Sequence, residues 1–184
     1  MIIGITGSFG SGKTTVANLF AKHGFKVINV DKLYHGIYKK NKSLKNKIKK
    51  EFGTLDKNKI KKIVFSDYVQ LKKLNKITHP IIIKEIKKMI NNKKSIVIDI
   101  PLLFEAKIQN LFDKIIVVKC DKQTQIKRIL KKKKHTKTEI NNIIKSQIPL
   151  NKKIKHADFV VDNDKTIKKT QGQVKKIVDA ISSL

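Results

Sequence analysis

Short apolar runs alternate along this chain with longer stretches in which apolar residues recur every three or four positions. A short apolar run bounded by glycine, proline or charged residues indicates a buried strand, and the longer spacing indicates an amphipathic helix. Because the two patterns alternate, the sequence predicts an α/β fold in which helices cover both faces of a parallel sheet. The predicted strands are residues 2–6, 26–30, 95–100, 113–120 and 157–163.

The segment between the second and third predicted strands, residues 32–92, shows helical spacing and no convincing strand. Its clearest helices are the runs KSLKNKIKKEFG and KLNKITHPIIIKEIKKMI, and Pro80 is expected in the first turn of a helix that begins near His79. After the fourth strand, KQTQIKRILKKKK predicts a basic helix. The run TKTEINNIIKSQI predicts a further helix, with Thr136 or Thr138 as its N-cap.

The size and cysteine content of the chain narrow the class of protein. Its 184 residues suit one compact domain, and it has no apolar run of about 18 residues that could cross a membrane. The single cysteine, Cys120, cannot form an internal disulfide and suits a reducing compartment. We therefore expect a cytoplasmic protein.

The formal net charge of +29 is of the kind that nucleic acid or an anionic membrane attracts. However, lysine carries nearly all of this charge, Arg128 is the only arginine, and tryptophan is absent. A dedicated nucleic-acid binder typically uses arginine forks and stacked aromatic side chains. We therefore expect no specific nucleic-acid partner and no membrane partner, and we attribute the charge to compositional drift towards lysine.

Residues 7–14 read GSFGSGKT and match the phosphate-binding pattern G-x-x-x-x-G-K-[ST] at every fixed position. The motif lies between a predicted strand and a predicted helix, where backbone N–H groups and the helix N-terminus can surround a phosphate chain. Lys13 is expected to contact the β- and γ-phosphates of ATP, and the Thr14 hydroxyl is expected to coordinate Mg²⁺. The short chain lacks a guanine-reading N-K-x-D segment, which favours a small-molecule kinase over a GTPase.

Two aspartates lie at the ends of predicted strands, at the sheet edge where open parallel sheets bind ligands. Asp31 could accept the proton of an acceptor hydroxyl that attacks the γ-phosphate. It could equally cap the following helix, and the two roles are compatible. Asp99 could hold a Mg²⁺-bound water, or it could be a buried carboxylate that caps a neighbouring turn.

Arg128 is predicted to lie on a basic helix together with residues 131–134, all of which are lysines. As the sole arginine, it suits a site that needs a planar fork of N–H donors. Cations that close over a transferring phosphoryl group assist its transfer. We therefore expect a role for Arg128 in catalysis, whereas each lysine of the run is expected to be a solvated surface residue.

Five segments, taken in order, resemble the dephospho-CoA kinase family. They are GITGSFGSGKTTVANLF, VINVD at residues 27–31, THPII at 78–82, VIDIPLLFE at 97–105, and QIPLNKK with HADFVVDN within 147–163. The glycine-rich motif is generic, but DIPLLFE together with the late ADFVVDN is specific to the family. Two departures stand out: Asn29 replaces the family's usual first aspartate, and lysine replaces some arginines in residues 131–134. Lysine keeps the charge but loses bidentate phosphate contact.

The resemblance implies a three-layer P-loop kinase fold with a five-stranded parallel sheet in one domain, residues 1–184. Within it, the core would be residues 1–31, 93–127 and 157–184, the acceptor-binding helices residues 32–92, and the lid residues 128–156. It implies that ATP and Mg²⁺ are the cofactors and that Asp31 is the base. The residues implied to bind ATP are Gly10, Ser11, Gly12, Lys13, Thr14 and Thr15. Those implied to contact the acceptor are Asp31, His79, Pro101 and Leu102. Arg128 would lie in the lid, and Lys153 matches the lysine that follows Q-x-P.

The expected reaction is the ATP-dependent phosphorylation of the 3′-hydroxyl of dephospho-CoA, by a monomer or weak homo-oligomer. One alternative is a kinase for another nucleoside or nucleotide, which would share the phosphate site and differ in the acceptor region. The other alternative is a nucleic-acid-binding NTPase, which the net charge of +29 suggests.

Overall fold

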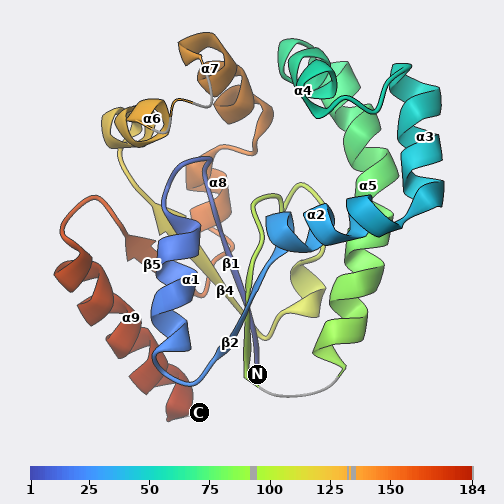
Figure 1. The fold of residues 1–184 in the computed structure, drawn as a ribbon. Coiled ribbons are helices and arrows are strands. Elements are labelled where there is room, and N and C mark those ends of the chain that lie inside the picture. Colours follow the sequence, from blue (N-terminus) through green and yellow to red (C-terminus); the bar gives the residue numbers. More distant parts are fainter. Residues whose placement is uncertain (92–94, 132, 134–135, 184) are drawn as a thin grey trace.

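A computed structural model describes residues 1–91, 95–131, 133 and 136–183 as a three-layer α/β arrangement (Figure 1). Within these ranges five parallel strands form one sheet with the order β2-β3-β1-β4-β5. The strands are β1 (Ile2–Gly7), β2 (Lys26–Asn29), β3 (Ile96–Asp99), β4 (Lys114–Lys119) and β5 (Phe159–Asp162). The predicted parallel sheet is confirmed, and each strand falls at its predicted position to within a few residues.

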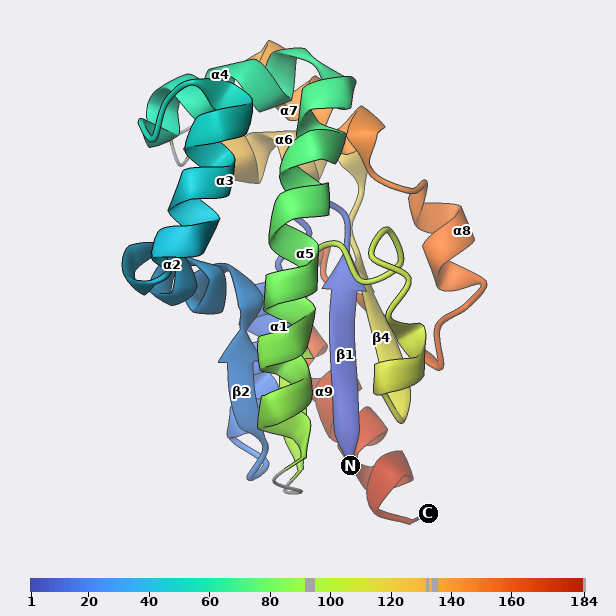
Figure 2. The ribbon, with the colours of Figure 1, turned by 90° about the vertical axis from the view of Figure 1, so that its right-hand side faces the viewer.

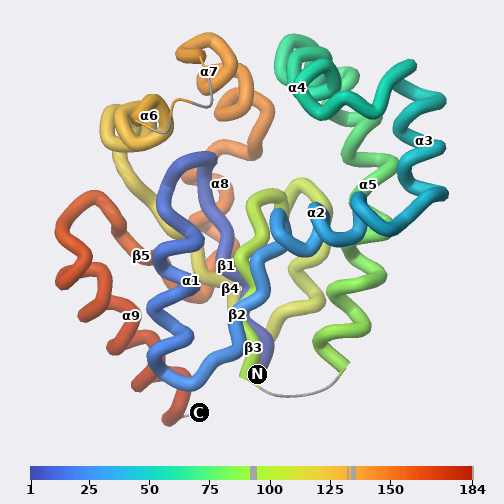
Figure 3. Tube along the Cα trace, in the orientation of Figure 1, coloured from blue at the N-terminus to red at the C-terminus, as the bar shows by residue number. Residues whose placement is uncertain are grey.

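Helices connect consecutive strands and add a large insertion between β2 and β3, as the chain trace in Figure 3 shows. The first five are α1 (Lys13–Ala21), α2 (Val30–Lys40), α3 (Lys42–Phe52), α4 (Lys57–Ser66) and α5 (Tyr68–Ile90). A short 3-10 helix at Gln109–Leu111 precedes β4. The others are α6 (Lys122–Lys131), α7 (Lys137–Ser146), α8 (Leu150–Ile154) and α9 (Ile167–Ser182). No described helix is both long enough and apolar enough to cross a membrane.

Both faces of the sheet are apolar because successive residues of a strand point to opposite sides. On β4, Ile116 and Val118 pack with α1 and α9, whereas Ile115 and Val117 pack on the face covered by α5 and α8. Figures 1 and 2 show these two helical layers on either side of the strands. This two-sided burial explains why the strands read as continuous apolar runs rather than as alternating ones.

Helix α5 continues through Pro80, so the prediction of a helix that begins near His79 is wrong. An interior proline removes one backbone hydrogen bond and costs about 3 kcal/mol. Apolar residues on both sides of Pro80 keep the helix continuous, since Leu74 and Ile77 pack among α2–α5 and Ile86 packs against the sheet. One continuous helix therefore joins the sheet to the helical insertion.

Helices α6 and α7 lie above the carboxyl ends of the strands, opposite α3 and α4 (Figure 1). Thr136 is the N-cap of α7 and forms a capping box with Glu139, which confirms one of the two predicted caps. The predicted basic helix ends earlier than expected, at Lys131, because Lys133 lies in a turn with φ of 51°. Lys132 and Lys134 lie outside the described residues.

Candidate active site

The phosphate loop, residues 7–14, joins β1 to α1. It requires glycine at two positions where other elements pack closely against it. Gly10 has φ of 81°, and a Cβ there would lie 2.5 Å from Ile129 Cγ1 on α6. Gly12 has φ of 91°, and a Cβ there would lie 2.1 Å from Asn163 Nδ2 after β5. The glycines of the motif thus allow both the left-handed backbone and the close approach of α6 and the β5–α9 connection.

Side chains from outside the loop set the direction of its peptide groups. Gln125 Nε2 donates a hydrogen bond to the Phe9 carbonyl, and Asn163 Nδ2 donates one of 2.9 Å to the Ser11 carbonyl. In a trans peptide the carbonyl and the next N–H point in opposite directions. The N–H groups of Gly10 and Gly12 therefore point away from these side chains, as an anion-binding loop requires.

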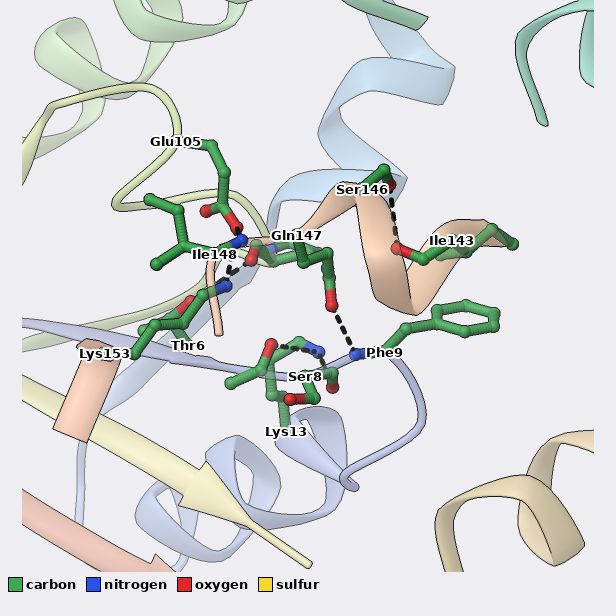
Figure 4. Close-up of polar contacts among 12 residues, drawn as sticks. Thr6, Ser8, Phe9, Lys13, Glu105, Ile143, Ser146, Gln147, Ile148 and Lys153 are labelled. Carbon is green, nitrogen blue, oxygen red and sulfur yellow. Dashed lines mark hydrogen bonds and ion pairs between the residues drawn. The ribbon is translucent and has the colours of Figure 1, made fainter. Parts of the chain in front are cut away.

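Lys13 is buried at the base of this loop, with 8% of its surface exposed. Its Nζ donates hydrogen bonds to the Ser8 carbonyl at 3.0 Å and to the Gly7 carbonyl at 3.3 Å (Figure 4). Burial lowers the pKa of Lys13 to about 8, a shift that Asp99 opposes and Lys153 reinforces. The side chain therefore remains mostly protonated at neutral pH, when its charge can attract phosphate.

Asp99, at the end of β3, links the phosphate site to β2. Its Oδ2 accepts hydrogen bonds from Thr14 Oγ1 at 2.6 Å and from Asn29 Nδ2 at 2.7 Å. Asp99 Oδ1 is buried and has no hydrogen-bond partner among the described residues. A carboxylate oxygen without a partner beside a threonine hydroxyl is the oxygen-rich setting that Mg²⁺ favours.

Asn29 rather than Asp31 is the N-cap of α2, which corrects one of the roles considered for Asp31. The Asn29 Oδ1 accepts a hydrogen bond of 2.9 Å from the Lys32 N–H, so the helix begins at Val30. Asp31 lies in the first turn, where its carboxylate is exposed to the cleft. The surrounding protein nevertheless reduces its hydration. This effect and the charge of Asp99 raise the pKa of Asp31, against the opposing charge of Lys13.

Two cavities meet at Asp31 and Pro101. The larger, of about 670 Å³, is bordered by the phosphate loop, Asp99 and Arg128. The smaller, of about 190 Å³, lies between α2, α5 and the segment after β3, and Asp31 and Pro101 line both cavities. Its walls are largely apolar. Burial lowers the pKa of His79, which lines the smaller cavity, so this imidazole is neutral at pH 7.

Arg128 reaches the larger cavity from α6 and braces the segment after β5. Its Nη2 donates a hydrogen bond of 2.8 Å to the Asn163 carbonyl, and Asn163 Oδ1 accepts one of 3.0 Å from Thr170 Oγ1. Arg128 Nη1 is buried and has no partner within the described part of the chain. Nη2 is therefore engaged in positioning, whereas Nη1 keeps N–H donors of the kind that bind an anionic group such as a nucleotide phosphate.

Most of the residues predicted from the sequence are brought together by the fold. The larger cavity is lined by Gly10, Gly12, Lys13, Thr14, Thr15, Asp31, Asp99, Pro101 and Arg128. His79 and Leu102 line the smaller cavity instead. Ser11 lines neither of the two, because it is buried and its N–H donates to the Ser8 carbonyl at 3.2 Å.

Sequence reasoning assigned no role to Gln125, Gln147 or Asn163, which hold the backbone of the phosphate loop. Gln147 and Asn163 fall within the two late segments that carried the family resemblance, and this was the available signal. Gln125 lies in an ordinary amphipathic helix, where nothing in the sequence marks it. Its contact with Phe9 spans 116 residues.

Known proteins that this chain resembles in sequence and fold include dephospho-CoA kinases. A family model for dephospho-CoA kinase matches residues 1–169. The dephospho-CoA kinase of Fusobacterium nucleatum is 39% identical over 191 residues, covering 98% of each chain. The structure of TT1252 from Thermus thermophilus has a TM-score of 0.81 at 28% identity, covering 98% of this chain and 96% of that one. For the dephospho-CoA kinase from Campylobacter jejuni, the TM-score is 0.67 at 27% identity, with coverage of 99% and 97%.

The family match extends far beyond the phosphate loop, and residues 1–169 include every residue that lines the two cavities. Agreement over this length excludes a likeness confined to a generic nucleotide-binding motif. The chain therefore belongs to the dephospho-CoA kinase family.

Proposed function

We propose that this protein transfers the γ-phosphoryl group of ATP to the 3′-hydroxyl of dephospho-CoA in the cytoplasm, the last step of coenzyme A synthesis. The observation that carries the proposal is the position of Asp31, which lines both the phosphate-loop cavity and the apolar cavity beside α5. A donor in one cavity and an acceptor in the other would meet at this carboxylate. Family membership supports dephospho-CoA as that acceptor.

In this proposal the phosphate loop and Lys13 bind the β- and γ-phosphates, and Arg128 approaches from α6. Thr14 and Asp99 would hold Mg²⁺, which when bound neutralises part of the phosphate charge. Phosphoryl transfer requires mainly positioning and charge stabilisation. Lys13 and Arg128, both at the larger cavity, provide such charges within the protein.

Asp31 acts as the base that receives the proton of the acceptor hydroxyl. Its raised pKa makes it a better proton acceptor than an ordinary aspartate. His79, Pro101 and Leu102 contact the acceptor along the smaller cavity. Residues 128–156 form the lid, which excludes water from the transferring group.

The acceptor is tested by measuring phosphorylated product from purified protein with Mg·ATP. We expect coenzyme A to form, with kcat/KM for dephospho-CoA at least about tenfold above that for AMP or adenosine. We also expect ATP hydrolysis that DNA and RNA do not stimulate. A preference for a nucleoside or nucleoside monophosphate would contradict the proposal, and polymer-stimulated hydrolysis would favour a nucleic-acid-binding NTPase.

Replacing Asp31 by Asn should lower kcat by about 10²–10⁴-fold, because the amide cannot accept the proton. The dissociation constant for ATP should change little, since the phosphate loop is untouched. Asp179→Asn is the matched control, because Asp179 is an exposed residue whose carboxylate pairs with Lys175 on α9. Unchanged turnover in Asp31→Asn would remove Asp31 from the mechanism.

The pH dependence of kcat/KM for ATP should show a basic limb near pH 8. The ammonium of Lys13 is charged below its pKa of about 8 and attracts phosphate, and it becomes neutral as the pH rises through that value. Since kcat/KM reports the free enzyme, the limb should reflect the empty site. A profile that stays flat up to pH 9.5 would show that the Lys13 charge does not control ATP capture.

A further inference from the structure

The backbone of Phe9, in the phosphate loop, is held from two directions by two glutamines, one just before the lid and one within it. Its N–H donates a hydrogen bond of 2.8 Å to Gln147 Oε1, and its carbonyl accepts one from Gln125 Nε2. Gln125 lies on α6, and Gln147 is the C-cap residue of α7. We propose that Gln125 and Gln147 are positioning residues that couple the lid to the geometry of the phosphate loop. This inference rests on the proposed lid and kinase function.

Gln147 acts on Lys13 through a single peptide group. Because the Ser8–Phe9 peptide is trans, fixing the Phe9 N–H towards Gln147 directs the Ser8 carbonyl to the opposite side. That carbonyl accepts the 3.0 Å hydrogen bond from Lys13 Nζ (Figure 4). Gln147 therefore determines the position of the buried Lys13 ammonium before ATP binds.

Gln147 is itself held firmly enough to perform this role. The next residue, Ile148, donates its N–H to Glu105 Oε1 at 3.0 Å, and Glu105 forms a 2.8 Å ion pair with Lys153. The Lys153 side chain is 0% exposed, so breaking this pair would leave a buried charge without compensation. Figure 4 shows these residues beside the phosphate loop.

Gln125 holds the carbonyl of Phe9, whereas Gln147 holds its N–H. Gln125 is 4% exposed, and Ile129, one turn further along α6, occupies the space beside Gly10. A shift of α6 therefore moves both the donor that holds the Phe9 carbonyl and the side chain that packs on Gly10. The Gly10 N–H, which belongs to the Phe9–Gly10 peptide, is oriented for phosphate only while this contact persists.

Gln147 and Gln125 bond to Phe9 through different atoms of their side-chain amides, so substitution by Glu should affect them differently. Gln147 uses its oxygen as an acceptor, so Gln147→Glu keeps the hydrogen bond. Gln125 uses its nitrogen as a donor, so Gln125→Glu loses the bond and places oxygen against oxygen. Each substitution adds one negative charge beside the same residue. KM for ATP should therefore rise in both variants. At saturating ATP, kcat should fall in Gln125→Glu and should be largely retained in Gln147→Glu.

We expect Gln147→Glu to retain kcat within about threefold of the wild type, whereas Gln147→Ala should lose about tenfold. The kcat of Gln125→Glu should be lower than that of Gln125→Ala. Ser182→Ala is the control, because among the described residues the Ser182 hydroxyl bonds only to the Val178 carbonyl within α9, at 2.9 Å, and kcat should not change. The proposal would be overturned by equal kcat in the two Glu variants, or by a kcat of Gln147→Glu no higher than that of Gln147→Ala.

Direct titration with ATP keeps this test separate from the identity of the acceptor. Each Ala variant should weaken ATP binding by about tenfold, and the double variant should weaken it by less than the product of the two, since both side chains hold one residue. Unfolding midpoints identify any variant that fails to fold. ATP affinity unchanged in both Ala variants overturns the coupling, whereas a wild type that binds ATP but makes no coenzyme A overturns only the proposed function.

Discussion

The hydrogen bonds to the Asp99 carboxylate determine the arrangement of the site, because they join three elements at one edge of the sheet. Thr14 brings the start of α1 to this carboxylate, and Asn29 brings the end of β2. Asn29 also caps α2, so the position of the helix that carries Asp31 depends on the same residue. The phosphate site, the proposed metal ligands and the proposed base are thus positioned by contacts within one short stretch of the sheet edge. This is the place where parallel strands commonly present their ligands.

Charge is concentrated around this edge before any ligand binds. Burial lowers the pKa of Lys13 while Asp99 opposes the shift, and Asp31 has a raised pKa from burial and from Asp99. Lys153, which is fully buried, forms an ion pair with Glu105, and the charges of both residues also reach Lys13. Such groups are costly to bury in water-free surroundings unless they compensate one another. A polyanionic nucleotide would complete the compensation, since it supplies negative charge beside Lys13 and Arg128.

Local patterns in the sequence predicted much of this arrangement. The phosphate loop was predicted from its motif, and Asp31 and Asp99 from their places after strands, because these signals depend on neighbouring residues. The continuous α5 was missed because packing on both sides of Pro80 outweighs the local preference of proline. The roles of Gln125 and Gln147 were missed because their contacts with Phe9 span 116 and 138 residues. Asn29, first noted as a departure from the family, proved to be the helix cap that Asp31 was considered for.

In the proposed reaction, Asp31 lies between the donor phosphate and the acceptor hydroxyl. The most direct test is a crystal structure with dephospho-CoA, Mg²⁺ and a non-hydrolysable ATP analogue bound together. We expect the acceptor's 3′-oxygen within about 2.6–3.2 Å of an Asp31 carboxylate oxygen and in line with the γ-phosphorus. An Asp31 side chain turned away from both groups in that complex, with the lid closed, would contradict it.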